Sequence, residues 1–264
     1  MSGPRAAPDG EPERGAPERG AAAEVPWAGA AALRDALAIY FSAQVLGVLF
    51  ASVLASSPGG PDAVLPGLVA LSPLTSLAVT LLWIHLRYRG AHALILGRRR
   101  PRAADVVVGV GVGVLCLLGQ RVVVLAIATL AERSGSELPT VQETFRTIAQ
   151  RPGALPLFVV TTVLLAPIAE ELLFRGVLFQ GLRRTTGFWL AALASGLLFT
   201  LPHLLEGGGV LAAVVIASGI LPLGVVFAAL VERRGSVVPA MVAHATYNAI
   251  GVALLVLLEP SFAA

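Results

Sequence analysis

The stretch that decides the fold is PLFVVTTVLLAPIAEELLFRGVLFQGL, residues 156–182. As a helix it is long and apolar enough to cross about 30 Å of hydrocarbon. Three ionisable side chains nevertheless lie within it, Glu170, Glu171 and Arg175. An ionisable residue inside a span costs roughly 2.5–3.5 kcal/mol on insertion scales, so such residues generally face a bundle interior and carry function. The stretch therefore predicts a membrane helix that contributes to a polar site.

The rest of the chain also has the composition of a membrane protein. Of its 264 residues, 56% are hydrophobic and only 13% are charged, against about 25% charged in a typical soluble domain. We therefore expect an all-α, polytopic transmembrane helical bundle of about seven spans. Besides 156–182, the predicted spans are 36–56, 63–86, 105–130, 187–206, 209–231 and 236–258.

The N-terminal segment, residues 1–30, differs from everything that follows. It is rich in Pro, Gly, Ala, Glu and Arg and repeats Pro-Glu-Arg-Gly at Pro12–Gly15 and Pro17–Gly20. Such a segment cannot bury enough apolar surface to fold, which predicts a disordered tail before a transmembrane domain at residues 31–264. The first apolar run begins too far along the chain for a signal peptide.

Arginine supplies all the basic charge, since the chain contains no Lys. The Arg residues are concentrated in alternate connections between the predicted spans, and the connections around 57–62 and 207–209 carry none. The 131–155 connection has three Arg residues offset by three Glu residues: Arg133, Arg146 and Arg151 against Glu132, Glu137 and Glu143. Under the positive-inside rule this alternation places the N-terminus in the cytoplasm. It also explains the basic balance without a nucleic-acid partner. The basic connections are 87–104, Arg183-Arg184 and Arg233-Arg234.

Two further patterns concern the membrane. In the 131–155 connection, Val141 and Ile148 belong to a stretch with apolar residues at i, i+4 and i+7, which predicts a short helix on the membrane surface. Gly109, Gly111 and Gly113 superficially resemble a phosphate-binding loop. No strand precedes them and their surroundings are apolar, so they predict close helix packing instead.

The two adjacent glutamates of the 156–182 stretch have different expected roles. Glu171 and Arg175 are i and i+4 and can form an ion pair on one helix face. Glu170 points about 100° away, which leaves it available for chemistry. The alternative is that both carboxylates serve only to neutralise Arg175.

Two later spans also carry polar residues at helical spacing. Phe199 and His203 are i and i+4 in the fifth predicted span, and His244 and Asn248 are i and i+4 in the seventh. Each His alone could be an ordinary core residue with its hydrogen bonds satisfied. Three spans that each contribute such groups favour a common site.

Glutamate, histidine and asparagine suit the hydrolysis of a peptide bond. A carboxylate shielded from bulk water can act as a general base on a water molecule, and an Asn amide can donate to an oxyanion. Glu170, His203 and His244 could alternatively bind zinc with a water in the open position, and the sequence leaves open whether zinc or no metal is used. Gly-x-Ser-x-Gly, His-Glu-x-x-His and paired Asp residues in separate spans are all absent from the sequence.

Three motifs follow one another on successive predicted helices. Their order resembles the CAAX-protease and bacteriocin-processing family of intramembrane endopeptidases, abbreviated CPBP and also called Abi. The resemblance covers roughly residues 155–255, the motif-bearing core. The motifs are Glu170-Glu171-x-x-x-Arg175, Phe199-x-x-x-His203 and His244-x-x-x-Asn248.

The resemblance implies a role for each matching residue. Glu170 corresponds to the water-activating base and His203 to the residue that assists it. His244 and Asn248 correspond to the oxyanion site. Both a metal-dependent and a metal-free glutamate mechanism are argued for this family. The supporting residues are Glu171, Arg175 and Phe199.

We therefore expect an intramembrane endopeptidase, multi-pass in a bacterial cell membrane. Its partners would be the lipid bilayer and a membrane-associated peptide or protein substrate, in CAAX-type processing or in bacterial peptide maturation and immunity. One alternative is a proton-coupled transporter, because buried Glu and His also form proton relays. The other is a non-catalytic immunity or scaffold protein that keeps the family fold.

The depths of the two histidines present a geometric problem. At about 1.5 Å per residue, His244 lies about 12 Å from the inner end of its span and His203 about 24 Å from its own. A common site therefore requires a fifth helix that is staggered or broken, and Pro202 offers a cause for a break. Different limits for the predicted spans would equally account for the difference in depth.

Overall fold

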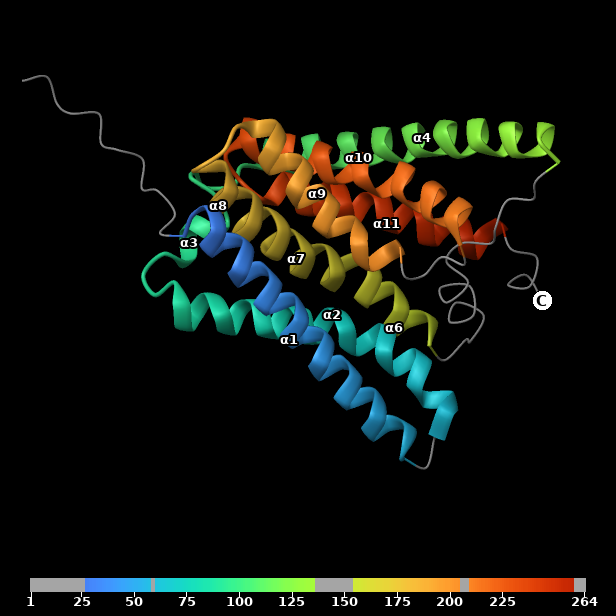
Figure 1. Ribbon diagram of the computed structural model, residues 1–264, viewed down its shortest axis with the longest axis horizontal. Coiled ribbons are helices and arrows are strands. Elements are labelled where there is room, and N and C mark those ends of the chain that lie inside the picture. Colours follow the sequence, from blue (N-terminus) through green and yellow to red (C-terminus); the bar gives the residue numbers. More distant parts are fainter. Residues whose placement is uncertain (1–26, 58–59, 136–153, 205–208, 259–264) are drawn as a thin grey trace, which may run out of the picture.

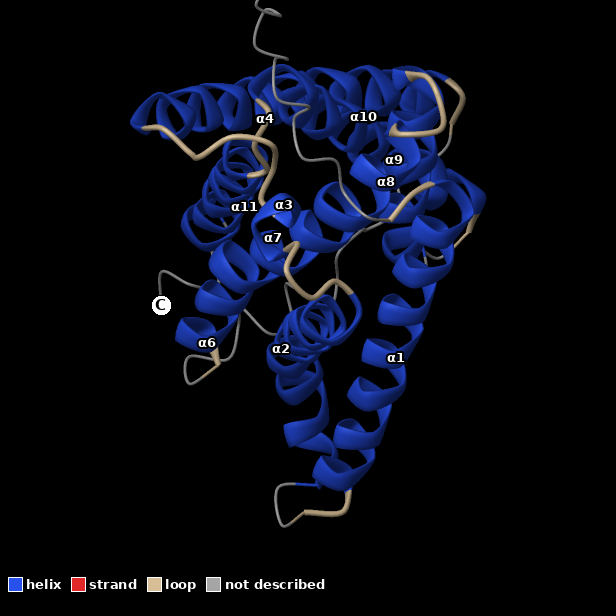
Figure 2. Ribbon diagram, turned by 90° about the vertical axis from the view of Figure 1, so that its left-hand side faces the viewer, coloured by secondary structure: helices blue, strands red, loops and turns tan. Residues whose placement is uncertain are grey.

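The computed structural model describes residues 27–57, 60–135, 154–204 and 209–258, and every regular element among them is a helix (Figures 1 and 2). Most of the tail expected at 1–30 and the surface helix expected around 141–148 lie outside the described residues. The first long helix begins at Gly29, ahead of the predicted start at residue 36. Its early turns include Asp35, which is buried and accepts hydrogen bonds from Arg34 and Tyr88.

Each of the seven predicted spans is largely helical over its described residues, and five helices are long and apolar enough to cross a membrane within the described part of the chain. These five are Gly29–Ala55, Ala103–Arg133, Leu155–Arg183, Val210–Arg234 and Val238–Leu257. Phe188–Leu204 is apolar but shorter, so a total of seven crossings stays a prediction. The helices are α1 (Gly29–Ala55), α2 (Gly60–Arg87), α3 (His92–Ile95), α4 (Ala103–Arg133), α6 (Leu155–Val160), α7 (Ala166–Glu170), α8 (Gln180–Arg183), α9 (Phe188–Leu204), α10 (Val210–Arg234) and α11 (Val238–Leu258).

The stretch 155–183 forms one continuous helical rod whose middle widens into two π-helical segments, η1 (Thr161–Leu165) and η2 (Glu171–Phe179). In η1 the Ala166 N–H donates to the Thr161 carbonyl, five residues back. The next carbonyl in that register, on Thr162, would need an N–H from residue 167, which is Pro167 and has none. The widened turns therefore leave the Thr162 carbonyl without a main-chain donor in that register. Such π segments often occur at functional sites.

This rod lies at the centre of the bundle (Figure 1). The paired helices α1 and α2 pack on one side of it, while α9, α10 and α11 contact it from the other. Every residue of η2 is buried. The two glutamates of the rod consequently lie where the two halves of the bundle meet.

Glycines bring α4 against α11. A Cβ at Gly113 would lie 2.5 Å from the Ala243 carbonyl oxygen, and one at Gly109 would lie 2.6 Å from the Val242 Cβ. The predicted close packing is confirmed at these two positions. At Gly111 it is wrong, because a Cβ there would meet nothing within 4 Å.

The basic connections meet at one end of the molecule. Asp105, at the start of α4, is buried and pairs with Arg99 at 2.6 Å and with Arg234 at 2.8 Å. Arg183, at the end of α8, pairs with Glu232 of α10 at 2.8 Å. One end of the bundle thus collects the Arg-rich connections, as the alternation in the sequence requires. A cytoplasmic N-terminus remains a prediction.

Candidate active site

The site is built around a buried ion pair. The Glu171 and Arg175 side chains are both fully buried, with the Arg175 Nη1 atom 3.1 Å from the Glu171 Oε1 atom. The predicted i, i+4 pair is therefore confirmed. Arg175 Nη2 also donates to the Gly224 carbonyl of α10 at 3.2 Å. These bonds offset part of the cost of taking two charges out of water. Among the described residues, the Glu171 Oε2 and Arg175 Nε atoms are buried without a hydrogen-bond partner.

Phe199 of α9 packs against this buried ion pair. The Arg175 guanidinium lies 4.5 Å from the centre of the Phe199 ring, within the range of a cation–π contact. The same ring meets the His244 ring edge-to-face at 5.7 Å. Phe199 therefore holds both the cation and the imidazole in place, which gives a physical reason for an aromatic residue one turn before His203.

His244 lies between the two glutamates. Its Nδ1 atom is 3.0 Å from Glu171 Oε1, and its Nε2 atom is 3.7 Å from Glu170 Oε2. A carboxylate can only accept, so Nδ1 carries the proton toward Glu171, and Nε2 faces Glu170. This geometry allows His244 to exchange a proton with Glu170 after a small movement.

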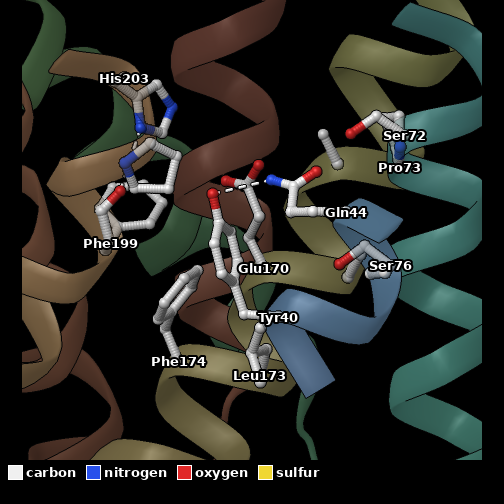
Figure 3. Close-up of a pocket in the computed structure, with 14 residues that line it drawn as sticks. Tyr40, Gln44, Ser72, Pro73, Ser76, Glu170, Leu173, Phe174, Phe199 and His203 are labelled. Atoms are coloured by element: carbon white, nitrogen blue, oxygen red, sulfur yellow. Dashed lines mark hydrogen bonds between the residues drawn. The ribbon is translucent and has the colours of Figure 1, made fainter. Parts of the chain in front are cut away.

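Glu170 differs from Glu171 in access. Its side chain is 28% exposed, whereas that of Glu171 is fully buried. It lines a pocket of about 240 Å³ together with His203 (Figure 3). Of the two carboxylates, Glu170 is the one that a substrate or a water could reach. The pocket is lined by Tyr40, Ala43, Gln44, Ser72, Pro73, Ser76, Ala166, Ala169, Glu170, Leu173, Phe174, Phe199, Pro202 and His203.

His203 reaches this pocket from the last described turn of α9. The possible break at Pro202 is wrong, because α9 continues through Pro202 to Leu204. The His203 Nδ1 atom lies 3.0 Å from the Phe199 carbonyl oxygen. Since a carbonyl accepts, Nδ1 carries the proton, and Nε2 of the neutral ring is left as an acceptor.

Asn248 occupies a different position from the one its predicted role suggests. Its Nδ2 atom donates to the Thr162 carbonyl at 2.8 Å. This is the carbonyl that η1 and Pro167 leave without a main-chain donor. Neither Asn248 nor His244 is among the residues that line the pocket. From α11, His244 lies 3.7 Å from Glu170, whereas Asn248 contacts Thr162 of η1.

The structure adds polar residues that the motifs did not reveal. Tyr40 and Gln44 of α1, and Ser72 and Ser76 of α2, line the pocket beside Glu170. Each pair has i, i+4 spacing within a largely apolar helix. That spacing is the signal by which the sequence could have indicated them.

The proposed zinc ligands do not assemble as a metal site in this arrangement. Within the described ranges, no group of three or more His, Cys, Asp or Glu residues is placed to hold a metal ion. Glu170 and His203 share the pocket, but His244 lies behind it with Nδ1 bound to Glu171. We therefore derive no step through a metal.

Residues 152–250 match the family model described as Rce1-like, type II CAAX prenyl endopeptidase Rce1-like. This region, well under half of the chain, is similar to the Rce1-like family. The resemblance seen in the three motifs is thereby confirmed. No curated protein and no solved structure matches the chain.

The Rce1-like region comprises the helices that carry Glu170, His203, His244 and Asn248, and it leaves α1, α2 and α4 outside. At the level of the family, this similarity supports an intramembrane endopeptidase of the CAAX type. Together with the apolar helices, it makes the protein an integral membrane protein.

Proposed function

We propose that the protein hydrolyses a peptide bond of a membrane-associated CAAX-type protein or peptide, with Glu170 as the base that activates the attacking water. One observation carries the proposal. Of two adjacent carboxylates, Glu171 is bound by Arg175 and His244 in the interior, while Glu170 opens on a pocket shared with His203. Arg175 and His244 both bind Glu171, so Glu170 is the carboxylate that remains available to activate a water.

The reaction would proceed at the pocket face of Glu170. A water between Glu170 and His203 donates one hydrogen to the carboxylate and the other to His203 Nε2. Glu170 takes the proton as the water oxygen attacks the substrate carbonyl, and then gives it to the leaving amine. The family resemblance implies that His244 and Asn248 hold the oxyanion, with the spare Asn248 amide hydrogen as a donor. Because neither residue lines the pocket in this structure, that role requires α11 to move toward the substrate.

The pocket walls suit the expected substrate class. Leu173, Phe174, Phe199 and Pro202 provide apolar surface beside Glu170. The aliphatic side chains of a CAAX-type sequence gain free energy by leaving water for such a surface. Immersion of the site in the membrane would admit substrates already held at the bilayer, prenylated peptides included.

Replacement of Glu170 tests the proposal directly. The full-length protein in liposomes is given a prenylated CAAX-type peptide, and release of the C-terminal fragment is followed. Glu170→Gln should lower kcat by about 10²–10⁴-fold while the thermal unfolding midpoint changes little, because a general base contributes on that scale. Glu132→Gln, at an exposed position of α4, is the matched control.

The outcomes separate the candidate functions. Unchanged cleavage by Glu170→Gln would contradict the proposed role of Glu170 as the general base. If the wild-type protein cleaves no CAAX-type peptide but carries protons across the liposome membrane, the transporter alternative is supported. Metal analysis of the purified protein, with a chelator added to the cleavage assay, distinguishes a metal-dependent from a metal-free enzyme.

A further inference from the structure

The pocket has a second polar wall, opposite the Rce1-like helices. Tyr40 and Gln44 of α1 lie one turn apart and line the pocket with Glu170. In Figure 3 their side chains extend toward Glu170, with His203 on the far side. α1 lies outside residues 152–250, so the family match assigns these residues no role.

A polar side chain in this position needs an explanation. α1 is a candidate membrane span, and a primary amide in hydrocarbon costs several kcal/mol unless it is hydrogen-bonded. Gln44 is exposed and satisfies only part of its capacity, because its Nε2 atom donates to the Tyr40 hydroxyl at 2.7 Å. One amide hydrogen and the Oε1 oxygen remain to face the pocket.

The chemistry of these free groups selects a ligand. A primary amide offers one donor and one acceptor side by side, which complements the N–H and C=O of a peptide main chain. The Tyr40 hydroxyl holds the amide at one hydrogen and thereby limits its rotation. Such an arrangement recognises main chain irrespective of sequence, whereas the apolar wall of Leu173 and Phe174 selects side chains.

We propose that Gln44, oriented by Tyr40, hydrogen-bonds the main chain of the substrate beside Glu170. Gln44 is thus a substrate-binding residue and Tyr40 a positioning residue. This inference rests on the proposed endopeptidase function, and it adds α1 to a site that the family motifs place on other helices. α1 and α2 then form one side of the substrate groove.

The first experiment compares kinetic constants in liposomes with the prenylated CAAX-type peptide. Gln44→Leu, which removes both free groups at similar volume, should raise KM about three- to tenfold with kcat nearly unchanged. Tyr40→Phe should raise KM less, because it removes only the group that orients the amide. Ser42→Ala, an exposed α1 position outside the pocket lining, is the control and should match wild type.

The second experiment locates the bond itself. In a series of peptides, each main-chain amide near the scissile bond is replaced in turn by an ester, and binding is measured to the Glu170→Gln protein. At one position the ester should weaken binding to this protein severalfold but have no further effect on Glu170→Gln with Gln44→Leu. A merely structural role of Gln44 would not produce this position-specific coupling.

The inference and the proposed function can fail separately. Equal KM values for Gln44→Leu and wild type, or additive effects at every ester position, overturn the inference while leaving the Glu170 result intact. Normal cleavage by Glu170→Gln overturns the proposed function, and the ester series still reports whether Gln44 binds the peptide. If Gln44→Leu does not fold, Tyr40→Phe combined with the same ester series decides.

Discussion

At the scale of single residues, two neighbours with identical chemistry acquire opposite properties from their surroundings. Glu171 accepts from Arg175 and His244 in a fully buried network, whereas Glu170 retains 28% of its side-chain exposure. The buried charge on Glu171 depends on Arg175, since the Arg175 guanidinium lies 3.1 Å away and is itself fully buried. Glu171 is therefore a structural carboxylate and a poor candidate for the base.

Removal of Arg175 should reveal this dependence. Arg175→Gln leaves the Glu171 carboxylate buried without its counter-ion and should lower the free energy of unfolding by roughly 3–5 kcal/mol. Thermal or denaturant unfolding in detergent measures the change. Arg133→Gln, an exposed position in the last turn of α4, should shift stability by less than about 0.5 kcal/mol. Equal stability of the two variants would contradict the role of the pair.

At the scale of elements, the π segments link α11 to the central rod. The five-residue register of η1 meets Pro167 and leaves the Thr162 carbonyl for an outside donor, which the Asn248 amide supplies at 2.8 Å. The widened turn thus depends on a partner from another helix. Asn248 has this structural task in addition to the oxyanion role that the family resemblance implies.

A double substitution tests this link. Asn248→Ala should destabilise the protein by about 1–2 kcal/mol, because the Thr162 carbonyl loses its donor. In a Pro167→Ala background the restored N–H can bond Thr162 in the same register, so the cost of Asn248→Ala should fall by at least half. Pro156→Ala, in the first turn of α6, is the control background and should leave the cost unchanged. Unfolding in detergent measures the cost of Asn248→Ala in the wild-type, Pro167→Ala and Pro156→Ala backgrounds, and a cost independent of Pro167 would refute the link.

At the scale of the whole molecule, the site is assembled from helices far apart in the sequence. Glu170 comes from the central rod, His203 from α9, His244 from α11 and the Tyr40–Gln44 wall from α1. The depth of α11 is set partly by α4, whose Gly113 lies against the Ala243 carbonyl, next to His244. A helix that carries no motif therefore positions one that does.

Two glycines on α4 should respond in opposite directions to alanine. Gly111 faces open space, so Gly111→Ala should stabilise the protein by about 0.8–1.0 kcal/mol through helix propensity alone. At Gly113 the new Cβ would lie 2.5 Å from the Ala243 carbonyl oxygen, so α11 must shift. Gly113→Ala should lower both stability and cleavage, measured by unfolding and by peptide hydrolysis. If Gly113→Ala stabilised the protein as Gly111→Ala does, Gly113 would not set the position of α11.

Local features of the fold and the site could be predicted from the sequence. Apolar runs predicted the helices because hydrocarbon requires every main-chain group to be satisfied within its own segment. The Glu171–Arg175 pair followed from i, i+4 spacing, which brings two side chains together whatever the rest of the chain does. The three motifs indicated the CAAX-protease and bacteriocin-processing family for the same reason, since each lies within one helix, and the Rce1-like match over residues 152–250 confirms the resemblance.

What the sequence by itself determined is therefore which segments are helices and which side chains share a face of one helix. Only the tertiary structure decided that His244 binds Glu171, that Asn248 binds Thr162 and that Gln44 shares the pocket with Glu170. These contacts depend on the rotation and depth of one helix against another. Interhelical packing, such as that of Gly113 on Ala243, sets both, and no spacing along the chain encodes it.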